Sequence, residues 1–212
     1  MNNPDLLQPA AVMAAYLIGA IPFGLLISLL ISKRDPREHG SGNIGATNAL
    51  RTGGKLVGAL TLLADIVKGA LPVALAVFGG WPELWIAAIA IAVSLGHVFP
   101  VYLRFKGGKG VATMFGAVLP WLPWAALAAL LVWLLSLRFS HYVSLSSILA
   151  GCALPLAAWA LEASLPAIAA CIIFGLLMTI RHAANISRLL AGTEPSTLDD
   201  RKAREAFELR GQ

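Results

Sequence analysis

The amino-acid sequence predicts an all-α fold, a polytopic bundle of seven membrane-spanning helices of which the fourth is short. Of its 212 residues, 58% are hydrophobic and 13% are charged, against roughly 45–50% and about 25% in soluble domains. Long apolar runs recur along the chain, and lysine and arginine gather in alternate connectors. A chain this apolar could not bury its surface in one soluble core, which excludes a soluble enzyme, a disordered tail and a free nucleic-acid binder.

Six apolar runs approach the ~20 residues that cross hydrocarbon as a helix. They lie at 9–32, 56–78, 84–103, 121–137, 143–161 and 166–180. No basic segment precedes the first run, so we expect it to remain as a span rather than to act as a signal peptide. Cys152 and Cys171 fall inside such runs and are interpreted as small hydrophobic residues, not as a disulfide or a metal pair.

The basic residues indicate the orientation of the bundle. The amino terminus and the connectors around Trp81 and Glu162 contain no Lys or Arg, so we expect them outside. The basic segments at 33–55, at 104–109, around Arg138 and from 181 onward should face the cytoplasm, which accounts for the net charge of +5 without a nucleic-acid partner. The carboxyl terminus would then be cytoplasmic, in a single domain at 1–212 that ends in a short tail at 195–212.

The stretch between Lys109 and Arg138 decides the number of spans. The chain must leave the cytoplasmic side and return to it there, with too few residues for two full crossings. Pro120 and Pro123 indicate a turn, so we expect a short helix at about 110–119 followed by the run at 121–137. The alternative is one helix through 110–137 and six spans, which would place Arg138 and the basic tail outside.

Three polar clusters belong to the predicted cytoplasmic face. The first, HGSGNIGATNALRTGGK at 39–55, combines glycines that allow close backbone approach with hydroxyls, amides and the guanidinium of Arg51, a set suited to phosphate. Its match to G-x-G-x-x-G is false because no strand precedes it. A flexible turn is the alternative. The expected ligand contacts are Ser41, Gly42, Asn43, Gly45, Thr47, Asn48 and Arg51.

The second cluster places lysines and glycines directly before a predicted helix. A glycine-flanked ammonium at a helix amino terminus should hold an anion, although the Walker A spacing is missing. The alternative is simple positive-inside charge. The expected contacts are Lys106, Gly107, Gly108, Lys109 and Gly110.

The third cluster is split between Ser144–Ser147 and the segment from Arg181 to Glu194. On a helix His182, Asn185 and Arg188 follow one another at intervals of three residues and share one face; a solvated helix end is the alternative. Asp65 and Lys68, three apart within a span, are expected to form a structural salt bridge, because each alone would cost ~2.5–3.5 kcal/mol in the membrane. A substrate contact by Lys68 is the alternative.

These clusters carry a resemblance to a known family. The strings S-G-N-I-G-A-T-N-x-x-R, G-H-x-F-P-V-Y-L-x-F-K-G-G-K-G-V-A-T, S-L-S-S-I and R-H-x-x-N-I-x-R-L-x-x-G-x-E occur in order between Ser41 and Glu194. They resemble the motifs of the bacterial acyl-phosphate:glycerol-3-phosphate acyltransferases, the PlsY family. The resemblance implies acyl transfer from acyl phosphate to the 1-hydroxyl of sn-glycerol 3-phosphate, giving lysophosphatidic acid and phosphate, the first acylation of phospholipid synthesis.

The resemblance also implies residue roles. Glycerol 3-phosphate binding and catalysis would fall on Ser41, Arg51, Lys109, His182 and Asn185, and acyl-phosphate binding on Gly107, Gly108 and Gly110. Ser146 and Ser147 match a polar turn, with Ser147 the expected ligand contact; Arg188 would contact substrate and Glu194 would be structural. No metal or cofactor is implied, and the partners are the two substrates and membrane lipid of the bacterial inner membrane, with the site facing the cytoplasm; protein partners are unknown.

Two other functions remain open from the residues alone. The basic glycine-rich loops would also suit a channel or transporter for phosphate esters, but that function needs polar elements at both faces, and only Asp65 and Lys68 lie deep. A rhomboid-like protease is weaker, since no G-x-S-x-G segment surrounds Ser41.

Overall fold

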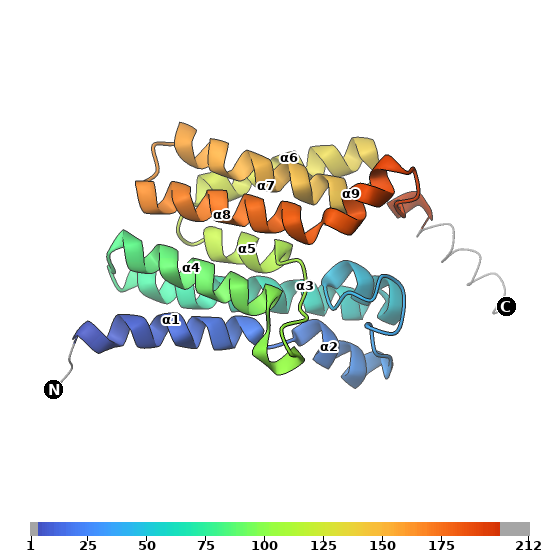
Figure 1. The fold of residues 1–212 in the computed structure, drawn as a ribbon, viewed down its shortest axis with the longest axis horizontal. Helices are drawn as coiled ribbons and strands as arrows, with labels where there is room; N and C mark the ends of the chain where they lie inside the picture. The colour runs from blue at the N-terminus through green and yellow to red at the C-terminus, as the bar shows by residue number, and fades with distance from the viewer. Residues whose placement is uncertain (1–3, 200–212) are drawn as a thin grey trace.

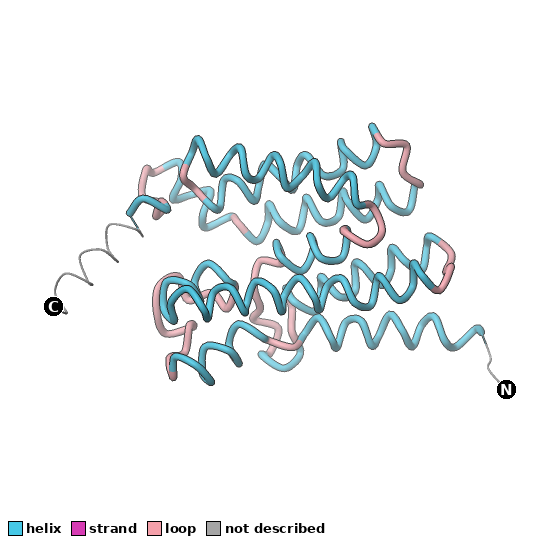
Figure 2. Tube along the Cα trace, turned by 180° about the vertical axis from the view of Figure 1, so that it is seen from behind, coloured by secondary structure: helices cyan, strands magenta, loops and turns pink. Residues whose placement is uncertain are grey.

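The computed structural model describes residues 4–199, and this part of the chain contains helices and no strand (Figures 1 and 2). The helices are α1 (Pro4–Ala20), α2 (Phe23–Ile27), α3 (Ala46–Phe78), α4 (Glu83–Val98), α5 (Val111–Val118), α6 (Pro123–Ser140), α7 (Val143–Ala160), α8 (Leu165–Arg181) and α9 (Ala183–Leu190). A π-helical turn, η1 (Ser28–Ser32), follows α2, and a 3-10 turn, η2 (Val101–Leu103), follows α4.

The helices form two layers with α5 between them (Figure 1). In one layer α1 packs on α4, and α3 of that layer packs on α5; in the other layer α7 packs between α6 and α8. Contacts between α4 and α8 join the two layers. The start of α1 lies at the opposite end of the bundle from α9 (Figure 1).

The bundle is a membrane protein fold, as the composition predicts. Five helices in the described residues are long and apolar enough to cross a membrane, and the pair α8 and α9, bent by 57°, would make a sixth. Large apolar side chains such as Phe78, Trp124 and Trp159 are more than two-thirds exposed on the outside of the bundle, where lipid replaces water. At 8 residues, α5 is only about 12 Å long, too short to span.

The short helix expected before the run at 121–137 is therefore present as α5. The alternative of one helix through 110–137 is wrong, because the chain leaves helical structure between α5 and α6. Two other boundaries differ from expectation. The first apolar run breaks at Ile21 and Pro22, and α3 begins at Ala46, ten residues before the predicted start, with a non-helical Gly54 (φ 88°) inside it.

The expected ion pair in the second span is confirmed. The Lys68 ammonium lies 2.8 Å from a carboxylate oxygen of Asp65, with both side chains at most 3% exposed. The same ammonium donates to the carbonyl of Ile21, at 2.9 Å. Pro22 interrupts the helix there and lacks an N–H, and Lys68 adds a second donor, beside the Phe23 N–H, to the Ile21 carbonyl at this break.

Close backbone contact fixes α5 against α3. A Cβ added to Gly116 would lie 2.1 Å from the carbonyl oxygen of Ile66, and one added to Gly69 would lie 2.2 Å from that of Thr113. Small residues at such crossings let membrane helices approach closely. The amino terminus of α5, which follows Lys109 and Gly110, is held in position by this contact.

Candidate active site

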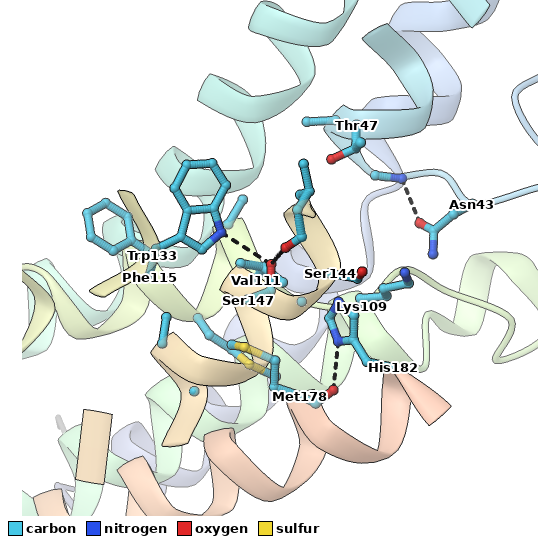
Figure 3. A pocket seen from close by; sticks show the side chains of 18 of the residues that line it. Asn43, Thr47, Lys109, Val111, Phe115, Trp133, Ser144, Ser147, Met178 and His182 are labelled. Carbon is cyan, nitrogen blue, oxygen red and sulfur yellow. Dashed lines mark hydrogen bonds between the residues drawn. The ribbon is translucent and has the colours of Figure 1, made fainter. Parts of the chain in front are cut away.

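A cavity of about 800 Å³ lies between the two layers. Its wall is formed by the first two-thirds of α3 with the segment before it, by the end of α4, by α5, α6 and α7, and by the region of the junction of α8 and α9 (Figure 3). One part of the wall is polar and cationic, with Arg51, Lys109 and Arg188. The remainder is apolar and includes Phe115 and Leu154.

The connector before α3 is shaped by the buried amide of Asn48. Its nitrogen donates to the carbonyl oxygens of Pro36, His39 and Asn43 at 2.7, 3.1 and 2.9 Å, and its oxygen accepts from the backbone N–H of Ser41 at 2.9 Å. The side chain is 2% exposed. Asn48 thus folds the glycine-rich segment back onto the first turn of α3, from which Arg51 projects one turn later.

A chain of polar contacts links the loop before α5 to the carboxyl-terminal segment. The Lys109 ammonium donates to the Asn185 amide oxygen at 2.5 Å, and the Asn185 nitrogen donates to Glu194 at 2.7 Å. The Arg188 guanidinium donates to the other oxygen of Glu194 at 2.8 Å. Glu194 thereby positions two of the side chains that sequence analysis assigned to substrate.

The surroundings of Lys109 and Glu194 shift the pKa values of both side chains. Burial lowers the pKa of Lys109 to about 8, and the neighbouring arginines add to this against the opposing carboxylate of Glu194. Burial would raise the pKa of Glu194, but the polar groups around it, Ser144, Asn185 and Arg188, outweigh burial and hold it below its usual range. At neutral pH this group of contacts therefore consists of cations around the ionised carboxylate of Glu194.

His182 occupies the junction of α8 and α9 and is neutral in this environment. Burial, together with the charge of Lys109, lowers the pKa of His182 to about 4. Its Nδ1 lies 2.7 Å from the carbonyl oxygen of Met178 (Figure 3). A carbonyl only accepts, so Nδ1 carries the proton and Nε2 keeps its lone pair.

Ser147 marks the boundary between the polar and apolar parts of the cavity. Its hydroxyl donates to the carbonyl of Val143 at 2.8 Å and accepts from the Trp133 indole N–H at 3.2 Å (Figure 3). The neighbouring Ser146 turns away from the cavity and bonds to the Tyr142 carbonyl and the Ser136 hydroxyl. Of the two serines, only Ser147 lines the cavity.

Most of the site residues expected from the sequence meet in this cavity. Its wall contains Ser41, Asn43, Gly45, Thr47, Asn48, Arg51, Asp65, Lys109, Gly110, Ser147, His182, Asn185, Arg188 and Glu194. The others lie elsewhere. Gly42, Lys106 and Gly107 line a second, smaller cavity, and Lys68 and Ser146 line neither.

Gly108 also lies outside the cavity wall, for a packing reason. A Cβ added there would meet the His97 ring nitrogen Nε2 at 2.2 Å, and the Gly108 N–H donates to the carbonyl of His97 at 3.2 Å. The glycine is thus required by contact with α4 as well as by the expected anion. The Nδ1 atom of His97 in turn lies 3.6 Å from the Oδ1 atom of Asp65. His97 therefore contacts both the glycine loop and the buried ion pair.

The apolar wall of the cavity is not predicted by the sequence. Trp133, Phe115, Leu154 and Met178 line it, but in the sequence they are ordinary members of apolar spans. Ser144, which also lines it, could have been found, since it belongs to the same S-L-S-S segment as Ser147.

The geometry defines an integral membrane protein with a mixed cavity, cationic on one side and apolar on the other. A profile described as glycerol-3-phosphate acyltransferase matches residues 9–192. The chain belongs to the glycerol-3-phosphate acyltransferase family, the PlsY family, in agreement with the resemblance of its motifs.

Individual relatives align with this chain over nearly its whole length. The glycerol-3-phosphate acyltransferase of Bordetella pertussis is 48% identical over 207 residues, covering 92% of this chain and 94% of its own. That of Thioalkalivibrio sulfidiphilus is 46% identical over 190 residues, covering 90% and 94%.

Solved structures agree in fold. The crystal structure of PlsY (YgiH), an integral membrane glycerol 3-phosphate acyltransferase, in its glycerol 3-phosphate form has a TM-score of 0.86 at 39% identity, covering 89% of this chain and 94% of that one. The lysophosphatidic acid form has a TM-score of 0.84, covering 91% and 97%.

Proposed function

We propose that this protein transfers a fatty acyl group from acyl phosphate to the sn-1 hydroxyl of glycerol 3-phosphate. The products are lysophosphatidic acid and inorganic phosphate. The observation that carries the proposal is the joining of cationic and apolar walls in one cavity, with Arg51, Lys109 and Arg188 on one side and Phe115 and Leu154 on the other. Such a cavity suits two substrates that are anionic and of which one carries a fatty chain.

The polar residues divide between binding and positioning. Arg51 and Lys109 hold the glycerol 3-phosphate phosphate, with Ser41, His182 and Asn185 around it. The relative whose crystal form is named for glycerol 3-phosphate supports this substrate. Glu194 keeps Asn185 and Arg188 in place through bonds of 2.7 and 2.8 Å, and so acts through them rather than on substrate.

The chemistry needs positioning and charge stabilisation more than a strong base. The substrate hydroxyl oxygen attacks the carbonyl carbon of acyl phosphate, a new ester C–O bond forms, and the bond from the carbonyl carbon to the phosphate oxygen breaks. The leaving phosphate is stabilised by the cations, which also offset the repulsion between two anionic substrates. No covalent enzyme intermediate is required.

The hydroxyl proton passes to a phosphate oxygen rather than to His182. A pKa of about 4 for His182 makes this imidazole a weak base at neutral pH. Its unprotonated Nε2 instead accepts a hydrogen bond from substrate, which orients the hydroxyl for attack.

We place this activity in the bacterial inner membrane, with the cationic end of the cavity facing the cytoplasm. The support is the distribution of basic residues, which gather at one end of the spans. The acyl chain lies between helices, in continuity with membrane lipid.

The test uses the purified protein in detergent, where no compartments exist. Glycerol 3-phosphate and acyl phosphate should yield lysophosphatidic acid and inorganic phosphate in equal amounts, whereas acyl-CoA should support no comparable turnover. Product formation without compartments separates an enzyme from a transporter. Comparable turnover with acyl-CoA would disprove the proposed donor, and no product from either donor would disprove the activity itself.

A further inference from the structure

A second cavity, of about 310 Å³, shares the loop before α5 with the active site and lies at the end of the bundle that we expect to face the cytoplasm. It is lined by Gly42, Ile44, Phe105 and Gly107, and by three cations, Arg37, Lys106 and Arg181. Arg37 comes from the connector before α3, Lys106 from the loop before α5 and Arg181 from the end of α8. Three segments far apart in the sequence thus bring positive charge to one small cavity.

The main cavity is separate from this one. Lys109 and Gly110 line the main cavity, whereas Lys106 and Gly107 line the second. Gly108, between them, is packed against the ring of His97. The same short loop therefore forms one wall of each cavity, and an anion bound in the second would not occupy the first.

Both arginines form hydrogen bonds that restrict their positions, and the Arg37 side chain remains 49% exposed. The Arg181 guanidinium donates to the carbonyls of Gly107 and Gly108 at 3.1 and 3.3 Å and lies 5.8 Å from the centre of the Phe99 ring. The Arg37 guanidinium donates to Asp35, with the shortest contact at 2.6 Å. Each guanidinium uses two of its nitrogens in these bonds, and a guanidinium has three nitrogens and five N–H donors.

The charge of the cavity favours an anionic group. Arg37, Lys106 and Arg181 supply three positive charges, which the carboxylates of Asp35, bonded to Arg37, and Glu38, which interacts electrostatically with Arg37, offset only in part. The remaining net positive charge attracts a phosphate monoester, which carries about −1.5 to −2 near neutral pH. Arginine forks are suited to phosphate oxygens, and ordered side chains lose less entropy when they bind.

The surroundings favour a phosphate carried by a lipid. Phe105, which lines the cavity, is 59% exposed, and the preceding Tyr102 and Val101 are 55% and 41% exposed. Aromatic and apolar residues exposed beside cations at the end of membrane spans are typical of the interface with lipid. A headgroup could enter the cavity while its acyl chains stay in the membrane.

We propose that the second cavity binds a phosphate monoester group, presented by an anionic phospholipid headgroup at the cytoplasmic surface. It would be occupied independently of the main cavity. Because two of its three cations contact solvent, binding should weaken as salt is raised.

The test measures retention of phosphatidic acid by the purified full chain in neutral detergent, using native mass spectrometry with phosphatidylcholine for comparison. Arg37→Ala and Lys106→Ala should each reduce phosphatidic acid retention about tenfold, the effect of losing one charge-assisted contact. Lys33→Ala is the matched control, since Lys33 is exposed in the same connector and lines neither cavity. Thermal unfolding of Arg37→Ala should match that of the parent protein.

A Lys109→Ala variant separates this site from the main one. It should lose acyl transfer while keeping the Arg37-dependent retention of phosphatidic acid. Addition of excess inorganic phosphate distinguishes the source of the ligand. If phosphatidic acid is still retained, the site prefers a lipid headgroup; if inorganic phosphate displaces phosphatidic acid, the site binds a phosphate group from any source. If Arg37→Ala and Lys106→Ala retain as much phosphatidic acid as Lys33→Ala, the proposal is overturned.

Discussion

Asn48 shows how much of a binding segment can depend on one buried side chain. Its amide fits this position only because it both donates and accepts: two N–H groups serve three carbonyls, and the oxygen serves the Ser41 N–H. Such a role is not visible in the sequence, where Asn48 is one of several polar residues in a glycine-rich stretch. The contacts make it a positioning residue for the segment that carries Ser41.

Replacement of that amide nitrogen by oxygen should disrupt the segment. Asn48→Asp places a carboxylate against three carbonyl oxygens, at a cost of about 1–3 kcal/mol or more, so we expect a lower melting temperature and a large loss of acyl transfer. Asn43→Asp is the control for stability, because the Asn43 oxygen accepts from the Gly45 N–H at 2.8 Å and a carboxylate can do the same. Equal melting temperatures for the two variants would contradict this role.

Arg51 should depend on the shape of its head group and not only on its charge. A guanidinium can offer two parallel hydrogen bonds to a phosphate, and an ammonium cannot reproduce them. Arg51→Lys should therefore lower kcat/KM for glycerol 3-phosphate by about 10- to 100-fold, measured as phosphate release. Lys33→Ala should be nearly silent. If activity instead falls in proportion to the total positive charge removed, the loops attract substrate through their summed charge, and the hydrogen-bond geometry of Arg51 is not required.

Lys109 should give the enzyme a pH dependence on its alkaline side. Its pKa of about 8 in the free protein means that the ammonium is charged below that pH and neutral above it. KM for glycerol 3-phosphate should accordingly rise by about tenfold per pH unit above roughly pH 8, while kcat changes less because bound phosphate favours the charged form. Lys109→Arg should flatten this rise, and a rise that is unchanged in Lys109→Arg would assign it to another group.

At the scale of elements, hydropathy predicted where the helices lie but not where their backbones break. The run at 9–32 is uniformly apolar, so its pattern cannot show that Pro22 ends α1 and that Lys68 caps the break from another helix. The glycines and hydroxyls at 46–55 favour a loop, yet α3 begins there, because Asn48 and the packing around it outweigh weak helix propensity. Local sequence does not contain these tertiary contacts.

The contact between α3 and α5 should be sensitive to one methyl group. Gly116→Ala would place its Cβ 2.1 Å from the Ile66 carbonyl oxygen, so α5 must shift, at about 1–3 kcal/mol for overpacking. We expect a lower melting temperature and, since the shift carries Lys109 with it, a higher KM for glycerol 3-phosphate. Leu134→Ala, at a position 51% exposed on α6, is the control. A Gly116→Ala variant with unchanged KM would show that the packing of α5 on α3 does not fix the position of the loop that carries Lys109.

At the scale of the whole molecule, the site exists only because two layers of helices meet. Lys109, in the loop that leads into α5, and Asn185, in α9, are 76 residues apart and lie in direct contact. Charge patterning predicted that the polar clusters share one face, because every basic connector belongs to the same side. Which side chains face the cavity depends on helix rotation and loop folding, so residue patterns alone do not distinguish Ser147 from Ser146 or Lys109 from Lys106. The preference for Ser147 and Lys109 came from the resemblance to the family.

The orientation of the bundle gives the last prediction. The connectors around Trp81 and Glu162 carry no Lys or Arg, and α1 begins at the opposite end of the bundle from α9 (Figure 1). The amino terminus should thus be outside and the carboxyl terminus in the cytoplasm. In a chain with Cys152→Ser and Cys171→Ser, a membrane-impermeant maleimide should label Asn3→Cys in intact cells and Gly211→Cys only after lysis; both positions lie outside the described residues. Labelling of both from outside would instead require an even number of crossings, and would place the basic tail, against its charge, on the outer surface.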